Sequence, residues 1–198
     1  MPIKHFTIQD AATLYGVKEW GNGYFGINSK GHLEVYPTQD ENLCADIYEI
    51  VQALRKKGIR TPLNLRFPQI LQDRVEILNE AFRKAIREYE YAGSYQGVFP
   101  VKTNQTKEVV EEIVRVGHKY RYGLEAGSKP ELMIALNMAL HPEALVLCNG
   151  YKDEAFIRMA LLARKAGRNV LITVEKMTEL PLILKVAKEL KVEPLLGL

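Results

Sequence analysis

From residue 93 onward, the chain alternates short apolar runs with longer amphipathic segments at a nearly constant period. The apolar runs centre on Val98, Gly123, Val146, Ile172 and Leu196, and successive centres lie 25, 23, 26 and 24 residues apart. The amphipathic segments between them cover 106–116, 129–140, 153–166 and 177–190. Short apolar runs that alternate with single helices predict an α/β fold with a parallel sheet.

The even spacing favours a barrel over a doubly wound sheet, because each strand is followed by one helix of similar length. We therefore expect a partial (β/α)8 TIM-type barrel of about five βα units. A closed barrel needs eight strands and roughly 250 residues. The pattern after Gly93 supplies five strands, and we expect the chain to be the N-terminal portion of a longer protein.

The part before this repeat has a different pattern, and we expect two domains, 1–60 and 61–198. Residues 24–27 and 32–36 alternate around the turn 28–31, which ends in glycine and predicts a β-hairpin. An amphipathic stretch near 44–57 predicts one helix. The second domain is expected to open with a short strand at 62–67, followed by a long helix that reaches residue 89.

The composition changes this picture little. The formal net charge is only +3 for 198 residues, and no apolar run is long enough to span a membrane, so neither nucleic acid nor membrane is an expected partner. Two cysteines, Cys44 and Cys148, and no signal pattern favour a reducing cytoplasmic setting. The four histidines are scattered and predict no metal site.

Lys102 directly follows the apolar run 97–101, which places it at the carboxyl end of the first regular strand. Active sites of barrel enzymes lie at that end of the strands. A lysine beside apolar walls has a lowered pKa and a nucleophilic amine, which suits Schiff-base chemistry. An ordinary solvated loop lysine is the alternative that position alone leaves open.

Two carboxylates follow the next predicted strand, in the segment 123–131. Glu131 stands three residues after Ser128, as in a capping box, and a helix cap is therefore its favoured role. Glu125 precedes the cap and has no such structural explanation. We expect Glu125 to be functional and to lie near Lys102, where either carboxylate could bind the ammonium.

Five segments carry a resemblance to a known family. They are 15–25, 66–71, 99–105, 123–132 and 146–153. Together and in this order they resemble the biosynthetic arginine decarboxylases, over almost the whole chain. The later segments are similar to ornithine and diaminopimelate decarboxylases and alanine racemase as well, whereas the first and last point to the arginine enzymes.

The resemblance implies a pyridoxal phosphate enzyme that converts L-arginine to agmatine and CO2, for polyamine (spermidine) biosynthesis. It implies that Lys102 holds the cofactor covalently and that Glu125 and Glu131 receive its freed amine. Asn104, in the same segment as Lys102, is counted with the cofactor-binding residues. The resemblance also implies magnesium, which matches no residue here, and a dimer or higher oligomer.

Several expectations remain open at this stage. The family's phosphate loop, ring-stacking histidine and proton-donating cysteine would lie beyond Leu198, so the chain alone is expected to be inactive. No residue that recognises a guanidinium can be identified, which leaves ornithine or diaminopimelate decarboxylase or a racemase as alternatives. A non-catalytic homologue that acts as an interaction module is the other alternative.

Overall fold

The computed structural model describes residues 5–198. The chain divides into two compact units, one that ends at Asp73 and one that runs from Arg74 to Leu198. Each unit has its own sheet, of three strands in the first and five in the second. We describe each unit by itself.

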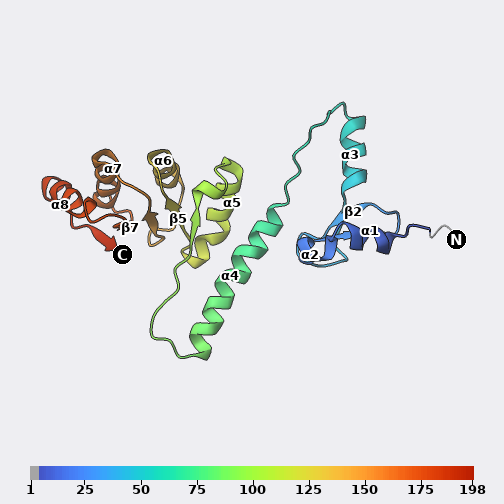
Figure 1. The fold of residues 1–198 in the computed structure, drawn as a ribbon, viewed down its shortest axis with the longest axis horizontal. Helices are drawn as coiled ribbons and strands as arrows, with labels where there is room; N and C mark the ends of the chain where they lie inside the picture. Colours follow the sequence, from blue (N-terminus) through green and yellow to red (C-terminus); the bar gives the residue numbers. More distant parts are fainter. Residues whose placement is uncertain (1–4) are drawn as a thin grey trace. The chain divides into compact units, whose positions relative to one another are not determined.

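The second unit confirms the repeat predicted from the sequence (Figure 1). Its strands are β4 (Val98–Pro100), β5 (Gly123–Ala126), β6 (Val146–Cys148), β7 (Val170–Thr173) and β8 (Leu195–Gly197). Its helices after β4 are η1 (Val101–Thr103), α5 (Lys107–Gly117), η2 (His118–Tyr120), α6 (Lys129–Asn137), α7 (Glu154–Lys165) and α8 (Glu179–Leu190). All five strands are parallel and pair in chain order, without the reversal of a doubly wound sheet.

The core of this unit lies between one face of the sheet and the helices. Successive side chains of a strand point to opposite faces. In β5, Leu124 and Ala126 are fully buried in the cluster that also contains Ile157 and Ile183 from the helices. Glu125 lies between them and therefore points to the other face of the sheet, in register with Leu147 of β6.

A glycine directly follows each of the predicted segments 106–116 and 153–166, which predicts a helix stop at Gly117 and at Gly167, and the two glycines behave differently. Gly167 has φ +91°, and the N–H groups of Gly167 and Arg168 bond back to Arg164 and Ala163, as in a Schellman motif. At Gly117 the prediction is wrong, because α5 includes this residue with φ −69° and passes into η2. The left-handed residue that ends this helical stretch is Arg121, at φ +55°.

The first unit contains the predicted hairpin and more. Its strands are β1 (Phe25–Ile27), β2 (Leu33–Val35) and β3 (Ala45–Asp46), and its helices before α4 are α1 (Ile8–Leu14), α2 (Val17–Gly21) and α3 (Ile47–Lys56). β1 and β2 are antiparallel and joined through the expected turn, and α3 matches the expected helix. The helices α1 and α2, of seven and five residues, are too short for a helical period to be visible, and neither they nor β3 was predicted.

The expected strand at 62–67 is absent and the segment is irregular. Pro62 has no N–H for a ladder, and the three-stranded sheet of the described first unit has no strand beside this segment. The long helix is confirmed as α4 (Pro68–Glu88), which begins earlier than its apolar period suggested. Neither α4 nor any other helix in the described residues combines the length and apolarity needed to cross a membrane.

Candidate functional site

The candidate residues lie where parallel strands β4, β5 and β6 end, on the edge of the sheet that we call the rim. The rim consists of η1 and residues 104–106 after β4, residues 125–131 from the end of β5 to the start of α6, residues 149–153 after β6, and residues 174–179 from β7 to the start of α8. η1 contacts both β5 and α6. Because all strands of the sheet are parallel, their carboxyl ends meet at this edge, as in barrel enzymes.

Lys102 occupies the predicted place, in η1 directly after β4. Its side chain is exposed, so the expectation of an amine held against apolar walls is wrong for this structure. The 3-10 turn explains the difference, since it buries Val101 completely and turns the next residue outward. No described residue makes a hydrogen bond or ion pair with the Lys102 amine.

Asn104 follows on the same turn and is exposed. Its side-chain oxygen accepts a hydrogen bond from the Thr106 N–H at 3.0 Å, and its own N–H donates to the Val101 carbonyl at 3.2 Å. This Asx turn leads the chain from η1 into α5. The arrangement gives Asn104 a structural role beside Lys102 and leaves its expected part in cofactor binding as a prediction.

Glu125 is the most unusual side chain of the rim. The residue is only 4% exposed, and its Oε1 is buried without any hydrogen-bond partner. Its neighbours in register on β4 and β6 are Pro100 and Leu147, neither of which offers a side-chain donor. A buried carboxylate oxygen without a donor costs free energy, and such a group indicates an acceptor kept for something the chain itself does not supply.

Glu131 lies in the first turn of α6 and is also buried. The Ser128 hydroxyl accepts a long hydrogen bond, 3.4 Å, from the Glu131 N–H, which confirms the N-cap. The second half of the predicted capping box is not formed. Glu131 Oε2 accepts from the N–H of Gly127 at 2.8 Å instead of from that of Ser128, because the carboxylate reaches one residue further back along the chain.

Gly127 brings the two carboxylates to one place. A Cβ on Gly127 would lie 3.6 Å from Glu125 Oε1 and 3.6 Å from Glu131 Oε2. Gly150 of the next loop packs on the backbone of Gly127, and its own Cβ would lie 2.6 Å from the Gly127 carbonyl oxygen. Gly150 has φ +72°, so this position after β6 requires glycine both for its backbone conformation and for the close approach.

The sequence interpretation missed a buried ion pair at this rim. Lys152 Nζ lies 3.2 Å from Glu179 Oε2, and the two side chains are 0% and 5% exposed. Burial raises the pKa of Glu179, but hydrogen bonds from the Lys152 and Glu175 N–H groups and the Lys152 ammonium outweigh it and lower the pKa. Both residues follow a strand by a few positions, and that spacing was the one signal available in the sequence.

The remaining rim lysines already have partners. Lys129 forms an ion pair with Asp153, and the Lys176 ammonium lies 3.7 Å from the centre of the Tyr151 ring. Lys152 is held by Glu179. Among the described lysines that follow the strand ends, Lys102 therefore has the amine that is free to react.

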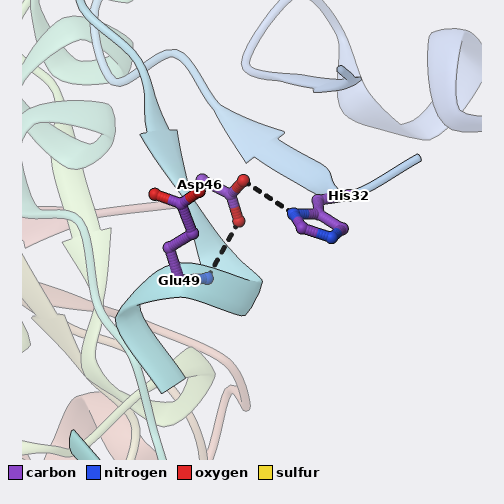
Figure 2. Close-up of side chains that lie close together, drawn as sticks. All are labelled: His32, Asp46 and Glu49. Atoms are coloured by element: carbon purple, nitrogen blue, oxygen red, sulfur yellow. Dashed lines mark hydrogen bonds and ion pairs between the residues drawn. The ribbon is translucent and has the colours of Figure 1, made fainter. Parts of the chain in front are cut away.

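One group of described residues elsewhere could hold a metal ion, although we expected none. His32, Asp46 and Glu49 of the first unit offer ligand atoms within 4.8 Å of one another (Figure 2). His32 Nδ1 lies 2.8 Å from Asp46 Oδ2, and the Asp46 carboxylate also caps α3 by accepting from the Glu49 N–H at 3.0 Å. The three side chains come from the hairpin turn, β3 and α3.

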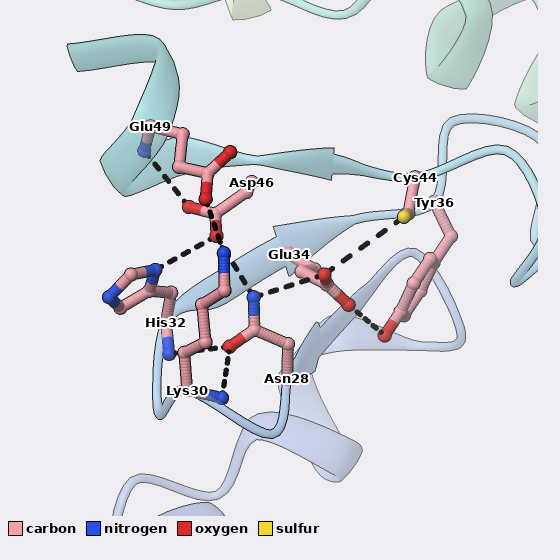
Figure 3. Close-up of polar contacts among 8 residues, drawn as sticks. All are labelled: Asn28, Lys30, His32, Glu34, Tyr36, Cys44, Asp46 and Glu49. Carbon is pink, nitrogen blue, oxygen red and sulfur yellow. Dashed lines mark hydrogen bonds and ion pairs between the residues drawn. The ribbon is translucent and has the colours of Figure 1, made fainter. Parts of the chain in front are cut away.

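The wider network shows that these carboxylates are already satisfied (Figure 3). Lys30 Nζ lies 2.5 Å from Glu49 Oε1, and the Asn28 amide donates to Asp46 at 2.9 Å. Burial would raise the pKa of Asp46, but hydrogen bonds from Glu49, His32 and Asn28 lower it to about 2. The cluster ties the hairpin turn to the start of α3, and we assign no metal to it.

The fold and the rim define the class of protein. A chain-ordered parallel (β/α) sheet carries a free lysine after one strand and a buried, unpartnered carboxylate near the end of the next. Residues 75–195 match the family model described as pyridoxal-dependent decarboxylase, pyridoxal binding domain. The chain belongs to this family.

Within this family, the chain is similar to biosynthetic arginine decarboxylases. The chain is 47% identical over 194 residues to the biosynthetic arginine decarboxylase of Prochlorococcus marinus strain MIT 9313, with 98% of this chain and 30% of the relative covered. It is 50% identical over 192 residues to that of Deinococcus radiodurans, with 97% and 29% covered. The chain thus spans about 30% of the length of the curated relatives it matches.

Solved structures agree with the fold. The biosynthetic arginine decarboxylase of Campylobacter jejuni aligns with a TM-score of 0.78 and 37% identity, over 92% of this chain and 30% of that one. A diaminopimelate decarboxylase from M. jannaschi aligns with a TM-score of 0.66 over 90% of this chain and 36% of that one. The latter is 22% identical and supports the fold alone.

Proposed function

We propose that this chain forms the pyridoxal phosphate-binding part of a decarboxylase that converts L-arginine to agmatine and CO2. The relatives at 44–50% identity are biosynthetic arginine decarboxylases, which supports arginine as the substrate. The single observation that carries the proposal is that two adjacent strand ends carry the free Lys102 amine and the buried, unpartnered Oε1 of Glu125.

The described residues fit the cofactor. Pyridoxal phosphate, when bound, supplies an electron sink that accepts the electron pair left behind when the α-carboxylate departs as CO2. Lys102 would hold the cofactor through its amine. Whenever that amine is free as an ammonium it needs an anionic partner, and the Glu125 carboxylate has a free oxygen for it.

Glu131 supplies the second carboxylate of the site that binds the Lys102 ammonium. Its Oε2 is fixed by the Gly127 N–H, which holds the second carboxylate beside the first without using all of its lone pairs. Two carboxylates in one place favour the ammonium form of an amine that approaches them. Asn104 supports the reaction because its N–H donates to the Val101 carbonyl and so closes the turn that carries Lys102. The resemblance to arginine decarboxylases makes a homo-oligomer the expected assembly, and the two cysteines favour a cytoplasmic setting.

Borohydride reduction of the holoenzyme, followed by peptide mapping, tests the lysine assignment. The reduction fixes the cofactor on the lysine that holds it, and we expect the pyridoxyl group on Lys102. Lys129 and Lys152 are the matched alternatives, because both follow strand ends and both are engaged in ion pairs. A pyridoxyl group on either of them, with Lys102 unmodified, would overturn the assignment.

Product analysis tests the substrate. We expect the holoenzyme to release CO2 and form agmatine from L-arginine, and to leave L-ornithine and diaminopimelate largely unchanged. Preference for one of the other two amino acids would make this chain part of a different decarboxylase of the same fold. A protein that binds pyridoxal phosphate but decarboxylates none of the three would support the interaction module instead.

A further inference from the structure

The ion pair between Lys152 and Glu179 is buried at the rim, yet no step of the proposed reaction uses it. The Lys152 side chain is 0% exposed and that of Glu179 is 5% exposed, and Lys152 is the buried lysine of the described chain. Replacing a buried ion pair by apolar residues of similar size is often neutral or stabilising, because desolvation of both ions offsets their attraction. Fold stability is therefore a weak explanation for this pair.

The pair joins two loops of the rim by several hydrogen bonds. Glu179 Oε1 accepts from the Lys152 N–H at 2.9 Å, and Oε2 accepts from the Glu175 N–H at 3.0 Å. The Lys152 ammonium also donates to the Gly150 carbonyl, and the Gly150 N–H donates to Glu175 at 3.0 Å. Together these contacts fix the position of the loop 149–153 relative to the start of α8.

Gly150, which this network holds on both its N–H and its carbonyl, is the residue that packs on Gly127. The close approach leaves no room for a Cβ, so a shift of the Gly150 backbone is passed directly to Gly127. Gly127 in turn donates its N–H to Glu131 and lies beside Glu125 Oε1. A contiguous path of contacts therefore runs from the ion pair to the two carboxylates.

The charges of Lys152 and Glu125 both act on the thiol of Cys148, the last residue of β6. Burial raises the pKa of its thiol to about 12, the Lys152 ammonium lowers it and the Glu125 carboxylate raises it. One buried thiol thus senses both Lys152 and Glu125. The positive charge of Lys152 lies in the low-dielectric region that also contains the unpartnered carboxylate, where charges act more strongly on one another than in water.

We propose that Lys152 and Glu179 are positioning residues that set the place and the electrostatic environment of Glu125 and Glu131. This inference rests on the proposed function, because it concerns the carboxylates that receive the Lys102 amine. It assigns a role in the reaction to two buried residues that the proposed chemistry does not otherwise use.

The test compares three variants of the holoenzyme with the unmodified protein. Lys152→Met together with Glu179→Leu removes both buried charges and leaves neither ion unpaired. Glu179→Gln keeps the size of the side chain and can still accept from the Lys152 N–H. Lys185→Met is the matched control, because Lys185 is 57% exposed and pairs with Glu154 on the surface between α7 and α8.

We expect the double variant to fold and to bind pyridoxal phosphate, with kcat lowered about 10- to 100-fold, since misplacement of a reacting group by about 1 Å costs this much. KM for arginine should change far less. The pH midpoint of the absorbance band of the bound cofactor should shift by about one unit, because the carboxylates around the Lys102 amine have moved. Glu179→Gln should change kcat and the midpoint in the same direction, and the control should change neither.

The outcomes separate the inference from the function on which it rests. If the unmodified holoenzyme binds no pyridoxal phosphate or releases no CO2 from arginine, the proposed function fails. If it does both, and Glu179→Gln retains the parent kcat and pH midpoint, the positioning role is wrong. Should the double variant not fold, Glu179→Gln alone decides. A loss of thermal stability with unchanged kcat and midpoint would also overturn the inference in favour of a merely structural pair.

Discussion

A buried carboxylate that has a partner only when a ligand is bound should destabilise the ligand-free protein. Glu125 allows this loss of folding free energy to be measured. Its Oε1 is buried without a donor, so the folded state loses the hydration of this oxygen and gains no hydrogen bond in return. An unsatisfied buried polar group costs about 1–3 kcal/mol. Glu125→Met keeps the length of the side chain and removes the oxygens. We expect the free energy of unfolding of the cofactor-free protein to rise by about 1–3 kcal/mol.

Glu131→Met is the matched control. It makes the same substitution at the second carboxylate, in the first turn of α6, and we expect it to lower the free energy of unfolding rather than raise it. Glu131 Oε2 accepts the Gly127 N–H at 2.8 Å, and the substitution leaves that donor without a partner. Loss of a hydrogen bond to a charged acceptor costs about 1.5–3 kcal/mol. The two variants should therefore move the stability of the second unit in opposite directions.

Urea unfolding of the cofactor-free proteins, followed by far-UV circular dichroism, measures both effects. The single tryptophan, Trp20, lies in the first unit, so its fluorescence reports that unit and should not change in either variant. Both variants should lose decarboxylase activity as holoenzymes. If Glu125→Met destabilises the protein as much as Glu131→Met does, the oxygen of Glu125 has a structural partner and the reasoning is refuted.

Three further outcomes follow from individual contacts. Gly123→Ala would place a Cβ 1.9 Å from the Leu145 carbonyl oxygen and should destabilise the second unit by about 3 kcal/mol or more. Gly167→Ala meets open space and should cost only about 1–2 kcal/mol, because the residue has a positive φ. Equal losses of stability in urea unfolding would contradict this difference. The pKa of Asp46 is lowered from 3.8 to about 2, so its contribution to stability is complete above both values and is lost as the pH falls toward 2. Acid titration of tryptophan fluorescence should accordingly be less steep for Asp46→Asn, and an unchanged profile would show that the cap is not charge-dependent. Lys102→Ala should abolish the absorbance band of enzyme-bound pyridoxal phosphate while leaving urea unfolding of the cofactor-free protein unchanged, and a retained band would mean that another lysine holds the cofactor.

Apart from the Lys102 amine and the Glu125 carboxylate, the charged groups that we have described at the rim have partners. Lys129, Lys152 and Lys176 are each tied to a partner, and Glu131 is tied to the backbone. The unpaired groups are then those that the proposed chemistry requires to be unpaired. The unpartnered oxygen of Glu125 destabilises the fold, and burial of the apolar side chains on the other face of the same strand offsets this cost.

The sequence by itself determined the order and type of the elements after residue 93. The helices there are long enough for their period to be visible, the strands are apolar runs, and some elements have local stop or cap signals such as Ser128 and Gly167. The strand ends follow from this order, and they placed Lys102 and Glu125 on adjacent strands. The absent strand at 62–67 shows the limit, because an apolar run becomes a strand only where another strand pairs with it.

Only the tertiary structure decided which side chains have partners. The exposure of Lys102, the orphaned oxygen of Glu125 and the bond from Gly127 to Glu131 depend on distances between residues of different loops. The ion pair of Lys152 and Glu179 joins residues 27 positions apart, and no local pattern relates them. Hydrogen bonds and ion pairs are lost within an ångström or two of misplacement, whereas hydrophobic periodicity survives any small shift. For this reason the sequence located the rim, and the three-dimensional packing determined which of its charged groups remain free to react.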